Sequence, residues 1–263
     1  MYRENHLKKR LLEQQQVLAC WLHTASPIVA EIMSLVGYDG AVIDLEHGPV
    51  DYLCATNLMQ AMSASPTTSI IRVPWNDPVE IKRALDTGAE GIMVPEVSSA
   101  AEAEALVRAC LYPPQGKRGA ASVLNRASSY GLDNAKYLED KGKELLVIAQ
   151  IESLEAVANL EQIAAVDGID VLFIGTNDLS GDCGKIGDYA NPVFIEALAK
   201  AERIIKKSPK FLGGLPRACD SAGAMLERGY DFVISASDVL MLRDTAMQDL
   251  KTNRKISGQG KTA

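Results

Sequence analysis

Residues 145–178 read LLVIAQIESLEAVANLEQIAAVDGIDVLFIGTND, and this stretch decides the fold of the 263-residue chain. Two short runs in it, Leu145 to Ile151 and Val171 to Ile174, are largely apolar on both faces, which is typical of parallel strands covered by helices. The segment between them, Leu154 to Ala165, has apolar residues at helical spacing. The stretch therefore predicts one strand-helix-strand unit of a parallel sheet.

The same unit recurs along the chain. We expect strands at Val17 to Leu22, Ala41 to Leu45, Ser69 to Val73, Gly91 to Val94, Leu145 to Ile151, Val171 to Ile174, Phe211 to Leu215 and Phe232 to Ser235. Helical spacing follows most of them, as at Val79 to Thr87, Ser99 to Leu111, Leu154 to Ala165, Pro192 to Lys206 and Asp220 to Arg228. This predicts an α/β fold, a single-domain (βα)8 TIM barrel. A doubly wound sheet shares the pattern, but the strand count favours the barrel, and no Gly-x-Gly-x-x-Gly follows a strand.

Three segments lie outside these repeats. Tyr2 to Gln16 is predicted to be a polar helix that closes one end of the barrel. The long connection from Glu96 to Glu144 is expected over the barrel mouth, because long loops in compact domains are usually functional. We assign residues 1–250 to the barrel and 251–263, which contain Gly, Ser, Gln and Lys, to a disordered tail.

The composition of the chain argues against several classes of partner. The chain has 34 acidic and 27 basic residues, a net charge of −7, which argues against a nucleic-acid partner. It has no apolar run of about 18 residues that could span a membrane, so we expect a cytoplasmic protein with no membrane partner. The five cysteines form no CxxC pair and are expected to be reduced thiols.

Two carboxylates end neighbouring strands of the predicted barrel. Glu152 follows the fifth strand and Asp178 the sixth, and paired strands lie about 4.8 Å apart, so both can reach one point. Such oxygen ligands suit a hard divalent cation, Mg2+, Mn2+ or Co2+. Gln150 lies on the same strand face as Glu152, where it can hold a metal-bound water or the substrate. The alternative is that both acids cap the helices that follow them.

A second polar group follows the second and third strands. His47 stands three residues after Asp44, and a carboxylate there can orient the imidazole as a general acid or base. Arg72 ends the third strand and can donate to a carboxylate or an enolate oxygen. Its alternative role is an ion pair with Asp44 or Asp86. We interpret His23 as structural.

These motifs resemble the HpcH/HpaI aldolase family. The resemblance rests on DLEHGP at 44–49, RVPWNDP at 72–78, KRALDTGA at 82–89, YPPQGKRG at 112–119 and QIE at 150–152, and it extends in order from about Val17 to Asp244. It implies a (βα)8 barrel and a homo-oligomer, a hexamer or trimer, with a C-terminal helix exchanged between subunits.

The resemblance also implies a reaction. Members of the family carry out reversible, metal-dependent cleavage of a 4-hydroxy-2-oxo acid to pyruvate, or a related 2-oxo acid, and an aldehyde. Carried over by motif, the metal ligands are Glu152 and Asp178, the enolate-stabilising group is Arg72, the acid/base pair is His47 with Asp44, and the substrate-binding residues are Gln150, Ser122, Asn177 and Asp178. The chain departs from the family at residues 175–178, where GTND replaces Gly-Pro-Ala-Asp or Gly-Pro-Ser-Asp.

Other chemistries are less well supported. No lysine ends a strand, since Lys82, Lys117 and Lys143 lie on predicted helix or loop, so metal chemistry is favoured over an imine. A CoA-ester lyase or an oxaloacetate-type decarboxylase could use the same ligands. A CoA enzyme needs a basic patch at the mouth, and only Lys117 and Arg118 offer one. A non-catalytic barrel that binds 2-oxo acids is the remaining alternative.

Overall fold

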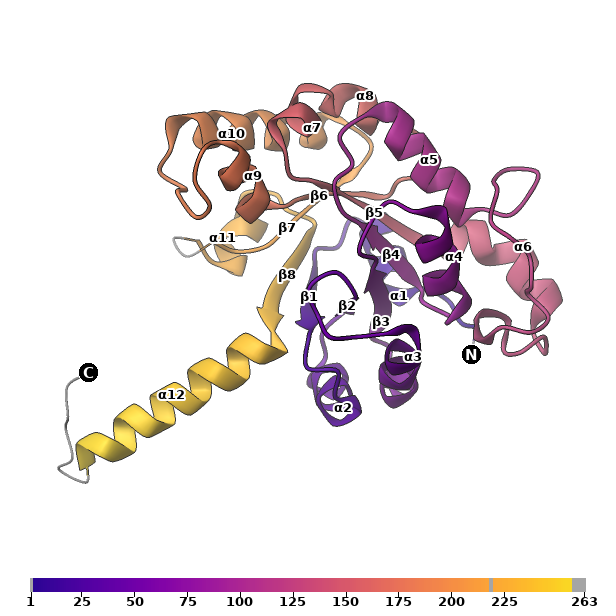
Figure 1. Cartoon of the computed structure of the whole chain (residues 1–263), viewed down its shortest axis with the longest axis horizontal. Helices are drawn as coiled ribbons and strands as arrows, with labels where there is room; N and C mark the ends of the chain where they lie inside the picture. Colours follow the sequence, from indigo (N-terminus) through magenta and orange to yellow (C-terminus); the bar gives the residue numbers. More distant parts are fainter. Residues whose placement is uncertain (1, 218–219, 257–263) are drawn as a thin grey trace.

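The computed structural model describes residues 2–217 and 220–256 and contains a closed barrel of eight parallel strands paired in sequence order (Figure 1). The strands are β1 (Val17–Leu22), β2 (Gly40–Asp44), β3 (Thr68–Arg72), β4 (Gly91–Val94), β5 (Leu146–Ile151), β6 (Val171–Ile174), β7 (Phe211–Gly214) and β8 (Phe232–Ser237). Each lies within two residues of the predicted bounds. The predicted TIM barrel is confirmed.

The described helices surround the barrel, except that the first closes its amino end and the last leaves it. They are α1 (His6–Leu12), α2 (Pro27–Val36), α3 (Tyr52–Ala61), α4 (Pro78–Asp86), α5 (Ala100–Cys110), α6 (Asn134–Glu144), α7 (Leu154–Ala158), α8 (Leu160–Ala164), α9 (Thr176–Asp182), α10 (Pro192–Lys207), α11 (Ala222–Glu227) and α12 (Asp238–Ile256). Side chains of Ser26, Asp77 and Ser99 accept N–H bonds at the starts of α2, α4 and α5. The predicted helix from Leu154 to Ala165 is divided at Asn159.

The barrel interior is filled by alternate residues of each strand. Its apolar layers include Val42, Ile70, Ile148 and Phe173, and the intervening strand residues pack outward against the helices. Buried leucines of α1 close the amino end of the barrel, where a Cβ on Gly40 would lie 2.6 Å from Leu7 Cδ1. The predicted N-terminal plug is therefore present, with α1 as its helix.

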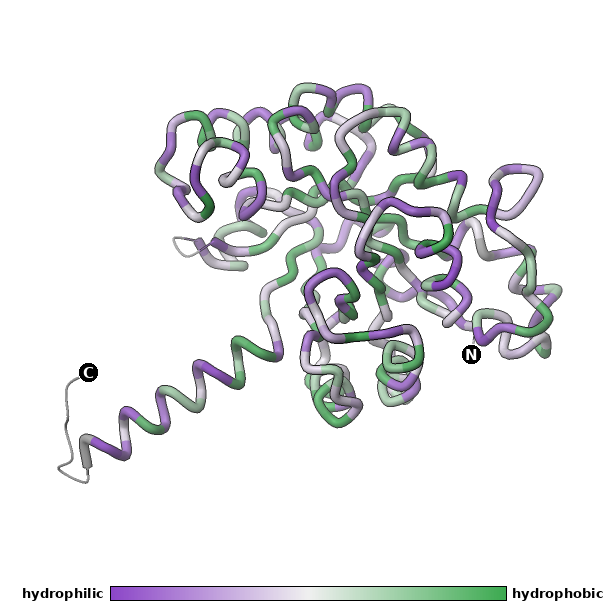
Figure 2. Tube along the Cα trace, viewed as in Figure 1, coloured by the Kyte–Doolittle hydropathy of each residue, from purple (hydrophilic) through white to green (hydrophobic). Residues whose placement is uncertain are grey.

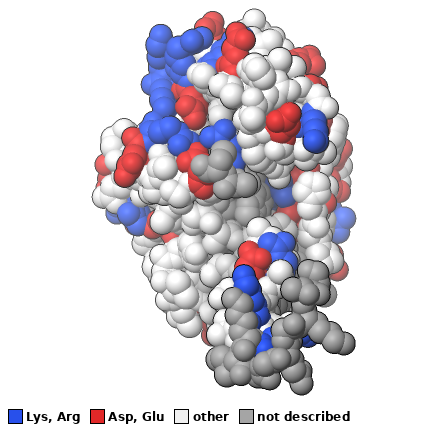
Figure 3. Space-filling view, turned by 90° about the vertical axis from the view of Figure 1, so that its left-hand side faces the viewer, with Lys and Arg blue, Asp and Glu red and all other residues white. Residues whose placement is uncertain are grey.

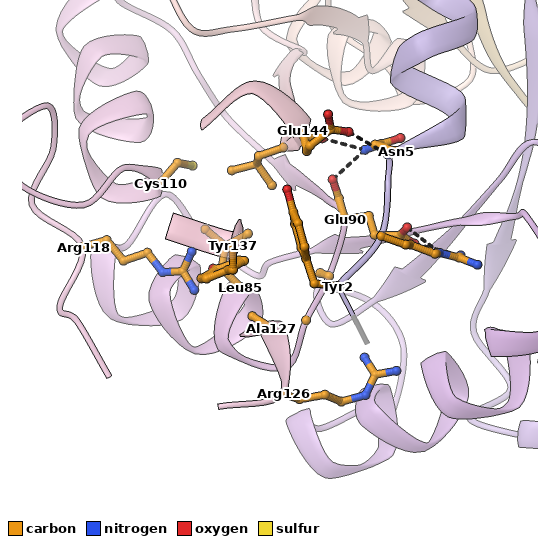
Figure 4. Close-up of a pocket in the computed structure, with 14 residues that line it drawn as sticks. Tyr2, Asn5, Leu85, Glu90, Cys110, Arg118, Arg126, Ala127, Tyr137 and Glu144 are labelled. Carbon is orange, nitrogen blue, oxygen red and sulfur yellow. Dashed lines mark hydrogen bonds and ion pairs between the residues drawn. The ribbon is translucent and has the colours of Figure 1, made fainter. Parts of the chain in front are cut away.

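Beyond its first residues, the connection between β4 and β5 does not lie over the barrel mouth, so that prediction is wrong. Arg118 and Asn125 both donate to Asp86 at the end of α4, with donor-acceptor distances of 2.6 and 3.1 Å. Because α5 runs back from the carboxyl end of β4, the chain that follows it starts at the amino end. Figure 4 shows Arg118 and Arg126 there, around a small cavity that Tyr2 and Tyr137 also line.

The last helix leaves the body of the barrel (Figure 1). It continues to Ile256, past the domain boundary predicted at residue 250, and residues 257–263 of the predicted tail lie outside the described residues. Exposed apolar side chains are spread along α12 (Figure 2): Val239, Leu240, Met241, Leu242, Met247 and Leu250. A helix with such an exposed face suits burial against another chain.

The charged side chains on the surface are distributed as the acidic composition leads us to expect. On the face in Figure 3, basic side chains stand beside acidic ones rather than forming a single basic field. Among the described helices, none is long and apolar enough to cross a membrane. Cys20, Cys54, Cys110 and Cys183 are free thiols, as predicted, and Cys219 lies outside the described residues.

Candidate active site

A cavity of about 780 Å³ opens at the carboxyl ends of the strands. Its lining includes Trp21, His23, His47, Arg72, Gln150, Phe173, Gly175, Thr176, Asn177, Asp178, Ser237 and Leu240. Several of these continue the inward-facing rows of the barrel: His23 follows Trp21 by two residues, and Gln150 follows Ile148 by two. The interior thus changes from apolar to polar where the strands end.

Glu152 is a buried acid at this boundary. Its carboxylate accepts the backbone N–H of Glu96 and the side-chain amide of Gln150, both at 2.7 Å. Burial raises the pKa of Glu152 to about 7, and the negative charge of Asp178 adds to the rise. A Cβ on Gly175 would lie only 2.5 Å from Glu152 Oε2, so glycine there leaves room for the carboxylate. Helix α7 is capped by Ser153 instead, so Glu152 is not its cap.

Asp178 stands in the first turn of α9, directly after β6, and its side chain is exposed to the cavity. Glu46, in the loop after β2, is near enough that the charge of Asp178 raises its pKa, although burial is the larger cause. Glu46, Glu152 and Asp178 therefore lie near one another at the carboxyl ends of the strands, and Asp178 lines the cavity. Two negative charges held this close repel each other, and a bound cation would remove the repulsion.

The donor atoms fit a hard divalent ion. Glu152 and Asp178 supply carboxylate oxygens, and the buried Gln150 Oε1 has no hydrogen-bond partner. The described residues contain no group of three or more His, Cys, Asp and Glu side chains arranged for a metal. Two carboxylates would leave other coordination positions to water and substrate, as Mg2+ and Mn2+ require.

Arg72 is held in a network of ion pairs where β2 and β3 end. Its Nε and Nη2 donate to both oxygens of Asp44, at 2.8 and 2.7 Å, across the β2–β3 pairing. Its Nη1 lies 2.9 Å from Glu46 Oε2, and its guanidinium stacks 4.3 Å from the ring centre of Trp21. The Asp44 ion pair weighed from the sequence is present, whereas Asp86 pairs with Arg118.

The expected contact between Asp44 and His47 is not formed, and this prediction is corrected. The fully buried Asp44 faces inward from β2 and is engaged by Arg72 and His23. His47 lies in the following loop with its imidazole exposed, 3.8 Å from Glu46 Oε2. His47 still lines the cavity, so its role as a proton carrier stays a prediction.

His23, which sequence reasoning interpreted as structural, stands in the site. Its Nε2 lies 3.1 Å from Asp44 Oδ2, and its Nδ1 lies 3.3 Å from Ser237 Oγ and 3.7 Å from Asp238 Oδ1. These partners raise the pKa of His23 to about 9, with Asp238 as the largest cause and Asp44 next. The signal was its place two residues after Trp21, on an inward row that ends at the mouth.

The two remaining predicted site residues, Asn177 and Ser122, lie at opposite ends of the barrel. Asn177 lines the cavity, and its side-chain oxygen accepts the hydroxyl of Tyr189. Ser122 lies in the loop at the amino end of the barrel, where its carbonyl accepts the Ser128 hydroxyl, and it does not line this cavity. The prediction that Ser122 binds substrate in this cavity is corrected, because the loop that follows α5 lies at the amino end of the barrel, away from the carboxyl ends of the strands.

Known proteins resemble this chain over nearly its whole length. A sequence model of the family described as HpcH/HpaI aldolase/citrate lyase matches residues 17–245. The chain is 40% identical to a 2-dehydro-3,6-dideoxy-6-sulfogluconate aldolase of Pseudomonas putida, over 90% of this chain and 92% of that protein. It is 37% identical to a 4-hydroxy-2-oxo-heptane-1,7-dioate aldolase of Escherichia coli, over 92% of each. A crystal structure of an HpcH/HpaI aldolase/citrate lyase family protein from Burkholderia cenocepacia J2315 superimposes with a TM-score of 0.89 at 34% identity, covering 95% and 99% of the two chains.

Proposed function

This chain belongs to the HpcH/HpaI aldolase/citrate lyase family and is an aldolase, and we propose that it reversibly cleaves a 4-hydroxy-2-oxo acid to pyruvate, or a related 2-oxo acid, and an aldehyde. The observation that carries the proposal is the position of Glu152 and Asp178. Asp178 lines the cavity together with Arg72 and Gln150, and Glu152 lies behind it, bonded to the Gln150 amide. Within the described part of the chain, neither acid is in an ion pair with a basic side chain. This arrangement suits an anionic substrate only when a cation joins it.

Glu152 and Asp178 would hold the divalent ion, with Gln150 Oε1 beside it. When bound, such an ion supplies a Lewis acid for the 2-oxo group of the substrate. We infer Mg2+, Mn2+ or Co2+ from the all-oxygen donor set. The acidic pair repels an unpaired substrate carboxylate, so ion and substrate are expected to bind in that order.

The chain's own groups then serve the carbon chemistry. As the C3–C4 bond breaks, its electrons move toward the C2 oxygen, and the Arg72 guanidinium stabilises the developing negative charge. Asp44 and Glu46 fix the guanidinium from two sides. The exposed imidazole of His47 accepts the proton of the 4-hydroxyl, and the aldehyde leaves toward solvent. A proton returned to C3 completes the 2-oxo acid.

The cavity favours this reaction over CoA-ester chemistry. Lys117 and Arg118, the basic pair that could have bound a CoA phosphate, lie at the amino end of the barrel, where Arg118 is paired with Asp86. Among the described residues that line the cavity, Arg72 is the one Lys or Arg side chain. A small 2-oxo acid needs no basic side chain beyond this one.

We also infer a homo-oligomer, a hexamer or a trimer, in the cytoplasm. The exposed apolar residues of α12 support an assembly in which this helix packs on another copy of the chain. Light scattering of the full chain is expected to give three or six copies, and a monomer would contradict the inference.

The proposal is tested by hydrogen exchange at the pyruvate methyl group. The enzyme with Mg2+, Mn2+ or Co2+ is expected to exchange methyl protons with deuterium oxide, because Arg72 stabilises the enolate of pyruvate itself. Removal of the ion with EDTA is expected to stop the exchange, and re-addition to restore it. Exchange that survives complete removal of the ion would refute the metal-dependent reaction.

A further inference from the structure

His23 joins two buried acids at the mouth of the barrel. Its ring lies between Asp44 on β2 and Asp238 at the start of α12, with Ser237 beside the second. Asp238 is itself fixed by the backbone N–H groups of His23 and Thr24, both at 3.0 Å. The imidazole therefore has a defined place rather than a choice of rotamers.

The geometry sets the charge of this ring. Nε2 faces a carboxylate oxygen at 3.1 Å, and Nδ1 faces a hydroxyl at 3.3 Å and a carboxylate at 3.7 Å. A neutral imidazole has a single N–H. On Nδ1 it would leave the Nε2 lone pair against the Asp44 carboxylate; on Nε2 it would leave the Nδ1 lone pair to the Ser237 hydroxyl, with the Asp238 carboxylate at 3.7 Å. The imidazolium donates from both nitrogens and satisfies both sides. The raised pKa of His23, about 9, agrees with this geometry.

The charges around His23 come from every neighbouring element. Asp44 is on β2, Glu46 and His47 follow β2, Arg72 ends β3 and Asp238 begins α12. Arg72 alone faces both Asp44 and Glu46, at 2.7 and 2.9 Å. With a neutral His23 this group would carry three carboxylates against one guanidinium, beside the cavity that must accept an anionic substrate, and an imidazolium reduces that excess of negative charge by one.

We propose that His23 is a positioning residue for the aldolase reaction: as an imidazolium it neutralises Asp44, so that Asp44 orients Arg72 while the guanidinium keeps its positive charge for the substrate's C2 oxygen. The inference rests on the proposed function. His23 does not act as the base, because it keeps its proton at neutral pH. It acts through Arg72 and is not a metal ligand.

The charge of His23 can be measured without any reaction. The chain has three histidines, so spectra of the 15N-histidine-labelled protein can be assigned with His6→Gln and His47→Gln. Both nitrogens of His23 are expected to stay protonated up to about pH 8. An ordinary histidine loses its proton near about pH 6.5, and such a titration of His23 would overturn the inference whatever the enzyme does.

Kinetics test its role. In the metal-loaded full chain, His23→Gln is expected to lower kcat for pyruvate methyl exchange by about tenfold or more, with a much smaller change in KM, because the oxyanion donor is misdirected. The fall in rate as the pH rises through about 9, expected of the wild type, is expected to disappear in the variant. His6→Gln, on the exposed side of α1, is the matched control and is expected to behave as wild type.

The outcomes separate the two claims. A folded His23→Gln variant with the wild-type kcat, or with a lower kcat and an unchanged pH profile, would overturn the positioning role. A wild-type enzyme that exchanges no methyl protons would instead contradict the aldolase reaction, and the histidine spectra would still decide the charge of His23.

Discussion

Replacing Glu152 with glutamine is expected to stabilise the metal-free fold at alkaline pH. The pKa of a glutamate is ordinarily 4.5, and in the folded chain burial raises that of Glu152 to about 7. A raised pKa means that the carboxyl contributes its full stability below pH 4.5 and loses it as the pH rises through 7. At pH 8 the loss corresponds to about 3 kcal/mol, and at pH 5.5 to about 1 kcal/mol.

Glutamine carries no charge at either pH. Its carbonyl oxygen can accept the Glu96 N–H, and its NH2 group can donate to Gln150 Oε1 once the Gln150 amide is turned over. The advantage of Glu152→Gln over wild type is therefore expected to grow by about 2 kcal/mol between pH 5.5 and pH 8. Urea denaturation in EDTA at the two pH values measures this difference, and any cost of the substitution itself cancels. Glu155→Gln, an exposed acid on α7, is the matched control with no such change.

Adding the divalent ion is expected to make the wild type more stable than Glu152→Gln. An ion that binds only the folded state stabilises it by about 2.7 kcal/mol at a concentration one hundred times its Kd, and this gain should be confined to wild type. An equal stability difference at both pH values would refute the reasoning, because Glu152 would then carry no cost of buried charge. So would equal stabilisation of both proteins by Mn2+.

Three further substitutions test individual groups. Gly175→Ala is expected to displace the Glu152 carboxylate and weaken Mn2+ binding measured by calorimetry, whereas Gly223→Ala, whose Cβ would meet no atom nearer than 3.9 Å, should bind as wild type. Arg72→Lys is expected to lower kcat by about 10²-fold while the fold is kept, because an ammonium cannot replace the two-sided fork; a wild-type kcat would contradict its role. His47→Ala is expected to keep metal and pyruvate binding but lose most aldol turnover, and unchanged turnover would remove it as the base.

The strands could be predicted because each is a short apolar run with a sharp polar end. The same regularity located Glu152, Asp178 and Arg72, since a residue at the end of a parallel strand must stand at the active face. Asn177, which was carried over from the family resemblance, also lines the cavity. Which end of the barrel holds these residues follows from strand direction.

The pairing of side chains could not be predicted in this way. Spacing suggested that Asp44 orients His47, but the inward row of β2 directs Asp44 to Arg72 at the end of β3 and to His23, which follows the neighbouring strand β1. Ser122 was misplaced for a similar reason, because the length of the connection gave no indication of which end of the barrel it covers. Both errors concern contacts between elements, which depend on packing.

The central claim is that Glu152 and Asp178 share one divalent ion. Crystals of the full chain grown with Mn2+ and pyruvate, measured at the manganese absorption edge, test it most directly. The account predicts one anomalous peak per chain, about 2.2 Å from an oxygen of each carboxylate and from the pyruvate oxygens. A peak bound elsewhere, or pyruvate bound in the cavity with no ion between the two acids, would contradict it.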